Sequence, residues 1–122
     1  MLSYIYDIRF NTMAYSKSNK FDSKKIALAK LNKALGHPAR IAILEIIANK
    51  KTCICGQIVD VIPLAQSTIS QHLKELKECG LIKGVIEGPK TCYCLDQKNI
   101  EEFERLLGSL FKNLKKNKFK KC

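Results

Sequence analysis

The strongest constraint on the fold of this chain is an amphipathic helical pattern that leads directly into a β-hairpin pattern, between residues 66 and 95. One face of the first segment, QSTISQHLKELKECG, carries four residues at helical spacing: Ile69, His72, Leu73 and Leu76. Ser67, Gln71 and Lys74 fall on the opposite face. Gly80 follows, and glycine commonly ends a helix. The pattern predicts a helix from Gln66 to Cys79 with one buried face and one polar face.

The hairpin pattern consists of two runs of β-prone residues, Leu81 to Glu87 and Thr91 to Leu95, around a turn at residues 88–90. A further short helix is predicted before the amphipathic helix, from the apolar residues Ile58, Val59 and Ile62. The sequence IPLA separates the two helices. Two short helices joined by a tight turn, followed at once by a hairpin, form the winged helix-turn-helix layout. We therefore expect a mainly α fold with a small β wing.

Helical patterns also precede this unit. Asp22 or Ser23 can cap a first helix that ends near Gly36, with these apolar positions: Ala27, Leu28, Leu31, Ala34 and Leu35. A second helix is predicted from Pro38 to about Asn49, with the following residues on one face: Ile41, Leu44, Ile47 and Ala48.

A last helix is predicted after the hairpin, where Asn99 and Glu102 have the spacing of a helix cap. Its apolar residues form one stripe: Ile100, Phe103, Leu107, Leu110, Phe111 and Leu114. No other predicted helix can cover this stripe fully, which favours a partner chain.

A chain of 122 residues is long enough for one compact domain. We expect a winged-helix domain for DNA binding and dimerisation over residues 21–115, an N-terminal extension over residues 1–20 and a basic tail over residues 116–122.

The net charge points to a polyanionic partner. The chain carries 22 Lys and Arg residues against 11 Asp and Glu residues, a formal net charge of +11. This excess favours nucleic acid before a membrane surface. The first residues lack the layout of a secretory signal, and no uncharged run approaches the ~20 residues of a membrane span. We therefore expect a cytoplasmic protein that does not enter a membrane.

Two cysteine pairs share the same spacing, Cys53 with Cys55 and Cys92 with Cys94. In a cytosolic chain they raise a metal, redox or packing question and not a disulfide framework. If the segment before the short helix forms a strand beside the second hairpin strand, alternation brings the four thiols together. Soft thiolates bind trivalent arsenic or antimony through three sulfurs, or zinc or cadmium through four.

Other functions for the thiols stay open. The pairs can oxidise and sense oxidants, hold a structural zinc in a nucleic-acid-binding module, or only pack, as we expect for Cys79. An enzyme with nucleophilic cysteines is disfavoured, because neither pair is Cys-x-x-Cys and no glycine-rich loop stands beside them.

The chain resembles the arsenic-repressor family of winged-helix metal sensors from Leu31 to Leu114. The resemblance is carried by LGHPARIAIL, CICG, PLAQSTISQHLKELKECGLI and GVIEGPKTCYC. It implies a homodimer built on the first and last helices. Such a dimer binds a twofold double-stranded DNA operator as a repressor and leaves it when a metal or metalloid binds.

A DNA-reading helix places particular side chains in the major groove. Those expected nearest to base edges are Gln66, Ser67, Thr68, Ser70 and Gln71. Those expected to contact phosphates are Lys74, Arg40, Lys83 and Lys90. His72 lies on the inward flank of the helix, which favours packing or hydrogen bonding at the boundary of the core.

The resemblance implies that Cys53 and Cys55 are the sensing pair. This chain departs from the family pattern, because the position of a third cysteine is Ile58. We expect the missing ligand to be Cys92 or Cys94, with Cys122 as the alternative. The family's other site, of Asp and His on the last helix, has no counterpart here, which disfavours a histidine-rich zinc sensor.

Overall fold

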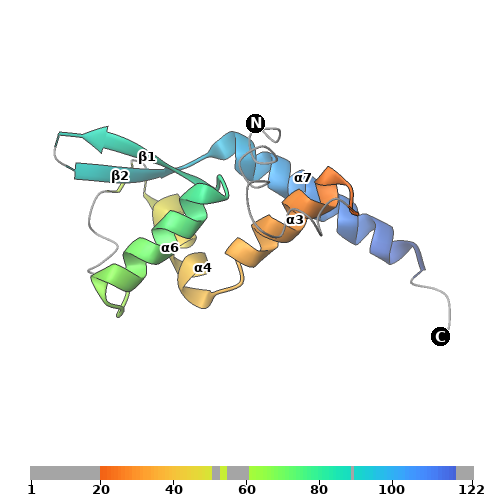
Figure 1. Ribbon diagram of the computed structural model, residues 1–122, viewed down its shortest axis with the longest axis horizontal. Helices are drawn as coiled ribbons and strands as arrows, with labels where there is room; N and C mark the ends of the chain where they lie inside the picture. Colours follow the sequence, from red (N-terminus) through yellow and green to blue (C-terminus); the bar gives the residue numbers. More distant parts are fainter. Residues whose placement is uncertain (1–19, 51–52, 55–60, 89, 118–122) are drawn as a thin grey trace.

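The computed structural model describes residues 20–50, 53–54, 61–88 and 90–117. Within these residues, three complete α-helices precede a β-hairpin, and a long helix with a short 3₁₀ turn follows it (Figure 1). The helices before the hairpin are α3 (Ser23–Ala34), α4 (Pro38–Asn49) and α6 (Gln66–Glu78). The remaining elements are β1 (Ile82–Glu87), β2 (Lys90–Leu95), α7 (Gln97–Leu114) and η1 (Lys115–Asn117). The predicted winged helix-turn-helix architecture is confirmed.

The first two helices begin where the sequence predicts. Asp22 caps α3, and its Oδ1 accepts a hydrogen bond from the backbone N–H of Lys25 at 2.9 Å. His37 caps α4, and its Nδ1 accepts from the N–H of Ala39 at 3.0 Å. Pro38 follows at the first helical position, where its missing N–H costs nothing.

The predicted apolar face of α4 is right at Ile47, which is buried, and wrong at Ile41 and Ala48, which are exposed. Ile41 is 48% exposed, whereas Ile43, which the sequence argument left out, is 0% exposed. The helix buries Ala39, Ile43 and Ile47, spaced four residues apart. Apolar residues surround nearly the whole of this helix, so its periodicity cannot select a face. Packing against α6 and β2 selects it instead.

Helix α6 buries the four residues that the sequence places on its inner face. Its end is a Schellman motif, in which Gly80 has φ 89° and donates its N–H to the carbonyl oxygen of Lys77 at 3.0 Å. The N–H of Leu81 donates to the carbonyl oxygen of Leu76 at 3.1 Å. This compact ending turns the chain directly into β1.

The predicted hairpin forms, with antiparallel pairs from Ile82 opposite Leu95 to Glu87 opposite Lys90, so Lys90 belongs to β2 and not to the predicted turn. Gly88 has φ 61°, a left-handed conformation that glycine adopts readily at a turn. A third segment joins β2 through an antiparallel bridge between Ile54 and Tyr93. The predicted short helix near residues 56–62 lies mostly outside the described residues, which include its helical end at Val61.

Helix α7 begins two residues before the predicted cap. Asp96 is the cap, and its Oδ1 accepts from the N–H of Asn99 at 3.3 Å. The prediction that Asn99 caps the helix is therefore wrong. Asn99 is buried within the first turn, and its Nδ2 donates to the carbonyl oxygen of Gly80 at 2.9 Å. This bond ties α7 to the end of α6.

The helices and the hairpin share one core, whose fully buried apolar members include Leu31, Ile43, Ile69, Leu76 and Ile82. Helix α3 contacts α7, and the carboxyl half of α7 projects beyond α3 in Figure 1. Over the described ranges, no helix is long and apolar enough to cross a membrane.

The burial of Ile43 and the exposure of Ile41 on α4 lead to a prediction about stability. Ile43→Ala should lower the free energy of unfolding by about 2–5 kcal/mol, because it removes fully buried methyl groups and leaves a cavity. Ile41→Ala, the matched control on the same helix, should cost less than about 1 kcal/mol. Urea unfolding followed by circular dichroism measures both. Equal losses for the two variants would contradict this packing.

Candidate thiol site and nucleic-acid interface

The bridge between Ile54 and Tyr93 sets the geometry of the cysteines. Ile54 donates its N–H to the carbonyl oxygen of Tyr93 at 3.0 Å, and Tyr93 donates back to Ile54 at 2.8 Å. In antiparallel pairing the flanking positions carry no mutual hydrogen bonds, and their Cα atoms lie only about 4.5 Å apart. Cys53 and Cys94 occupy such a position, with Cα atoms 4.6 Å apart.

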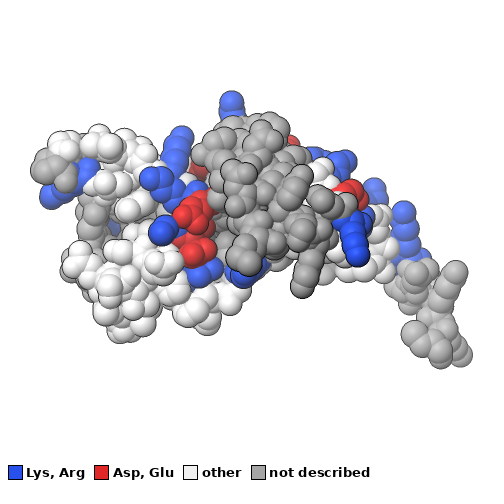
Figure 2. All heavy atoms as spheres, viewed as in Figure 1, with Lys and Arg blue, Asp and Glu red and all other residues white. Residues whose placement is uncertain are grey.

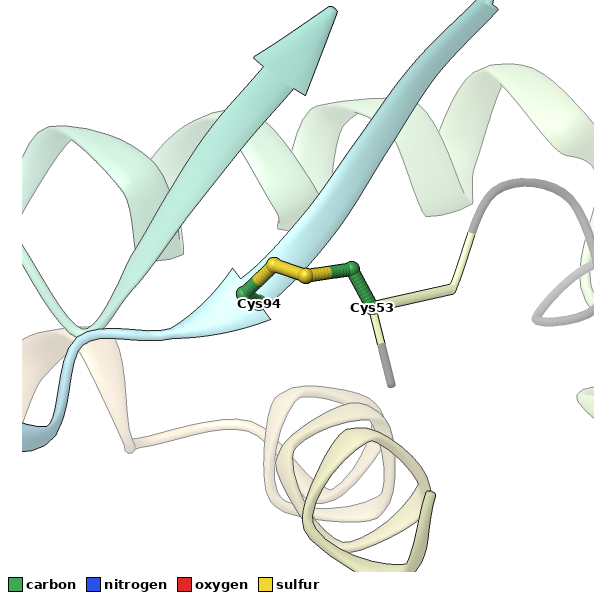
Figure 3. The surroundings of a disulfide bond; sticks show 2 residues. All are labelled: Cys53 and Cys94. Carbon is green, nitrogen blue, oxygen red and sulfur yellow. A yellow bond between two sulfur atoms is a disulfide. The ribbon is translucent and has the colours of Figure 1, made fainter. Parts of the chain in front are cut away.

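A disulfide joins Cys53 to Cys94 (Figure 3). It connects the segment that follows α4 to the carboxyl end of β2, across 41 residues of sequence that include all of α6. The predicted pairing of these two segments is confirmed. The expectation of reduced thiols without disulfides is wrong for this pair, because the bridge brings the two sulfur atoms into bonding range.

The other cysteines divide into three cases. Cys92 lies two residues before Cys94 in β2, is 0% exposed and is also disulfide-bonded. Cys79 is buried, and its S–H points to the carbonyl oxygen of Leu76 at 3.2 Å, as expected for a packing role. Cys55 and Cys122 lie outside the described residues.

The cysteine sulfurs of the paired segments suit a soft metal ion. Cys53 and Cys94 place two sulfurs side by side, and strand alternation puts Cys92 on the same face of β2 as Cys94. Once reduced, such thiolates are ligands for zinc, cadmium or trivalent arsenic. Among the residues that the structure describes, no group of three or more His, Cys, Asp and Glu side chains is arranged to hold a metal ion.

The predicted base-reading side chains lie on the outer face of α6. All five are exposed: Gln66, Ser67, Thr68, Ser70 and Gln71. The amide of Gln71 also donates to Glu75 Oε1 at 3.2 Å. The predicted phosphate-binding residues Lys74, Lys83 and Lys90 are exposed as well. Figure 2 shows Lys and Arg side chains at the hairpin tip and along the far half of α7.

Arg40 is placed differently from the other predicted phosphate contacts. It is half-buried, and its Nε donates to Nδ1 of His72 at 3.1 Å. Its Nη1 donates to the carbonyl oxygen of Ala34 at 3.3 Å. Arg40 thus links α4 to α6 and to the end of α3. A phosphate contact by Arg40 stays a prediction. The guanidinium group would have to make it in addition to these two hydrogen bonds.

His72 occupies the boundary position that the sequence predicts, and is 7% exposed. Its ring centroid lies 4.4 Å from that of His37, a cluster that sequence reasoning missed. The sequence features that could have indicated this pair are the inward-facing His72 on α6 and His37 directly before Pro38. Among the described residues, no group hydrogen-bonds Nε2 of His72.

The surroundings of His72 favour its neutral form. Burial lowers its pKa below the ordinary value of 6.5, and the nearby His37 and Arg40 lower it further, whereas Glu75 opposes them. Because Arg40 always donates, Nδ1 of His72 must stay unprotonated to accept its hydrogen bond. A proton on Nδ1 would break the link between α4 and α6.

This cluster predicts that the fold weakens in mild acid. As the pH falls below 6.5, the unfolded chain takes up a proton at His72 that the folded chain resists, so the free energy of unfolding decreases. Above that pH, both states are neutral at this ring and the effect is absent. His72→Gln, which keeps an acceptor for Arg40, should show a shallower decrease between pH 6.5 and 5. Urea unfolding across this range measures it, and equal slopes would contradict the assignment.

Comparison with known proteins agrees with this architecture. The profile described as "Bacterial regulatory protein, arsR family" matches residues 37–83. An uncharacterized HTH-type transcriptional regulator of Methanocaldococcus jannaschii is 36% identical over 83 residues, covering 67% of this chain and 92% of that protein. A cadmium resistance transcriptional regulatory protein CadC homolog of Staphylococcus aureus is 26% identical over 102 residues, covering 83% of this chain and 81% of that protein.

A solved structure supports the fold. An ArsR-like transcriptional regulator from Rhodococcus sp. RHA1 superimposes with a TM-score of 0.67 at 21% identity, covering 79% of this chain and 90% of that one. The profile, the relatives and the winged helix agree on a non-enzymatic regulator that binds DNA. The chain belongs to the arsR family of bacterial transcriptional regulators.

Proposed function

We propose that this chain is a homodimeric repressor that a soft metal or metalloid ion releases from its operator. The ion binds the reduced thiolates of Cys53, Cys55, Cys92 and Cys94. The observation that carries the proposal is the antiparallel bridge at Ile54 and Tyr93, which brings cysteines from two distant segments together. Trivalent arsenic or antimony, cadmium and zinc are the candidate ions. The cadmium in the name of the Staphylococcus aureus relative supports this class of inducer.

The site supports a switch because of where its two halves lie in the chain. One half follows α4, the other half is in the hairpin, and the recognition helix α6 lies between them in sequence. Thiolates that hold one ion tie the two halves together. The tie shifts α6 and the wing relative to successive major grooves, which lie about 34 Å apart. A coupling of ~1–3 kcal/mol gives a useful switch.

The DNA side of the proposal rests on exposed polar groups. The outer amino-terminal face of α6, where a recognition helix contacts base edges, is formed by Gln66, Ser67, Thr68, Ser70 and Gln71. Lys74 on α6 and Lys83 and Lys90 on the hairpin are also exposed, as phosphate contacts require. The operator is double-stranded DNA, and the protein acts in the cytoplasm, where that DNA is found.

An ion titration tests the proposal. The reduced protein first selects a duplex from a random-sequence pool, and arsenite, antimonite, cadmium and zinc are then titrated into the complex in a gel-shift assay. At least one ion should weaken DNA binding by about 5–150-fold. Cys94→Ser should keep DNA binding and lose the response, whereas Cys79→Ser, the matched control, should keep both. The proposal fails if all four ions leave the complex intact.

Two further experiments distinguish metal sensing from redox sensing and from a structural zinc module. Oxidation to the Cys53–Cys94 disulfide ties the same segments as an ion would, so redox sensing is the second candidate function. It is favoured if oxidised, metal-free protein binds the selected duplex more weakly than reduced protein does. Circular dichroism after chelation addresses the structural-zinc module. A regulator stays folded without metal, and a structural zinc module unfolds.

The homodimer rests on the apolar face of α7. Phe111 and Leu114 are 51% and 61% exposed, in the part of the helix that projects beyond α3. Leu110 lies beside them and is also exposed. An uncovered apolar stripe on a long helix favours a symmetric contact with a second copy of the chain.

A charge placed in this stripe should break the dimer. Phe111→Glu should raise the dimer dissociation constant at least about tenfold, because a buried carboxylate has no partner in the contact. Asn113→Glu introduces the same charge on the same turn and should leave the dimer intact. Sedimentation velocity over a concentration series measures both. A monomeric wild-type protein, or equal effects of the two variants, would contradict the contact.

A further inference from the structure

The Cys53–Cys94 pair lines a cavity of about 220 Å³ between the end of α4 and the start of α7. The other lining residues are Ile47, Ala48, Lys50, Leu95 and Gln97. Sites for drug-sized ligands are typically about 300–1,000 Å³, so the occupant of this cavity must be smaller. Both cysteines of one disulfide thus line a small cavity.

The two cysteines of β2 differ in access. Cys94 is half-buried and lines the cavity, whereas Cys92 is 0% exposed and does not. Thiol–disulfide exchange requires a thiolate to reach a sulfur atom directly. An external thiol can therefore approach Cys94 from the cavity, whereas the sulfur of Cys92 is shielded.

The cavity also carries a positive charge. Lys50 is the charged residue among the described residues that line it, and it lies at the exposed carboxyl end of α4. An ammonium group there attracts an anion at contact distance. A small thiol that carries a carboxylate can place this group near Lys50 while its sulfur approaches the disulfide.

We propose that this cavity is an exchange site for small carboxylated thiols, which reduce Cys53–Cys94. The thiolate attacks one sulfur of the pair, the Cys53–Cys94 bond breaks, and a mixed disulfide forms as the second cysteine leaves as a thiolate. A second small thiolate attacks the mixed disulfide and releases the first cysteine. Two small thiols become one small disulfide, and the protein disulfide becomes a dithiol. The inference rests on the proposed function only for the use of the freed thiolates, which then bind the inducing ion.

The exchange is tested on the oxidised full-length protein with three thiols: mercaptoacetate, neutral 2-mercaptoethanol and cationic cysteamine, at equal thiolate concentrations. Alkylation with iodoacetamide and peptide mass spectrometry measures the reduction of Cys53, Cys94 and Cys92 over time. Rates are divided by those toward a neutral reference disulfide. Cys53 and Cys94 should be reduced before Cys92, with mercaptoacetate about fivefold faster than neutral 2-mercaptoethanol, the effect of one charge pair at contact in water, and with cysteamine slowest.

Variants identify the source of the preference. Lys50→Gln should abolish it, whereas Lys24→Gln, which removes the same charge from an exposed position on α3, should keep it. About 1 M salt should also suppress it in the wild type. The inference is overturned if Lys50→Gln and Lys24→Gln show the same preference, if Cys92 is reduced first, or if Cys53–Cys94 resists all three thiols.

The outcome is independent of metal sensing. Chemically reduced Lys50→Gln protein should bind arsenite as the reduced wild type does, measured by loss of reactive thiols. A failure of both proteins to bind arsenite counts against the proposed function and leaves the exchange result standing.

Discussion

The pairing of Ile54 with Tyr93 is the contact on which the thiol site depends. Two backbone hydrogen bonds fix the register, and the register places Cys53 opposite Cys94 at the closely spaced position of an antiparallel pair. A shift of one residue would turn these sulfurs to opposite faces. Because the paired segments flank α6 in sequence, any bond between them encloses the recognition helix in a closed loop of chain.

A second constraint holds α6 from its other side. Arg40 connects α4 with the end of α3 and with His72 on α6, and Asn99 connects the end of α6 with α7. Polar bonds to buried or half-buried partners have stricter geometry than apolar contacts. Helix α6 is therefore fixed at its inner face and its end by directional bonds, while its outer polar face stays exposed. Ion binding or oxidation at the thiol site would therefore act on helix α6, whose position is set by the hydrogen bonds of Arg40 and Asn99.

Local chemistry made much of this fold predictable. Asp22, Gly80 and Gly88 mark the boundaries of elements, because caps and left-handed turns require particular residue types. The pairing of the cysteine segments was expected from the winged-helix layout, and strand alternation then predicted that their thiols converge. The buried face of α4 could not be predicted in full, because a helix that is apolar nearly all round gives no periodic signal, and its neighbours select Ile43. Asn99 was misplaced because its side chain bonds to Gly80, a tertiary partner that sequence spacing cannot reveal.

The central claim is that cysteines from both segments hold one ion. X-ray absorption spectroscopy of the reduced protein with one equivalent of arsenite tests it most directly. Three sulfur neighbours are expected around arsenic in the wild type, and fewer in a variant with both Cys92→Ser and Cys94→Ser. A three-sulfur shell that survives in this variant, or an arsenic bound only to oxygen in the wild type, would contradict the shared site.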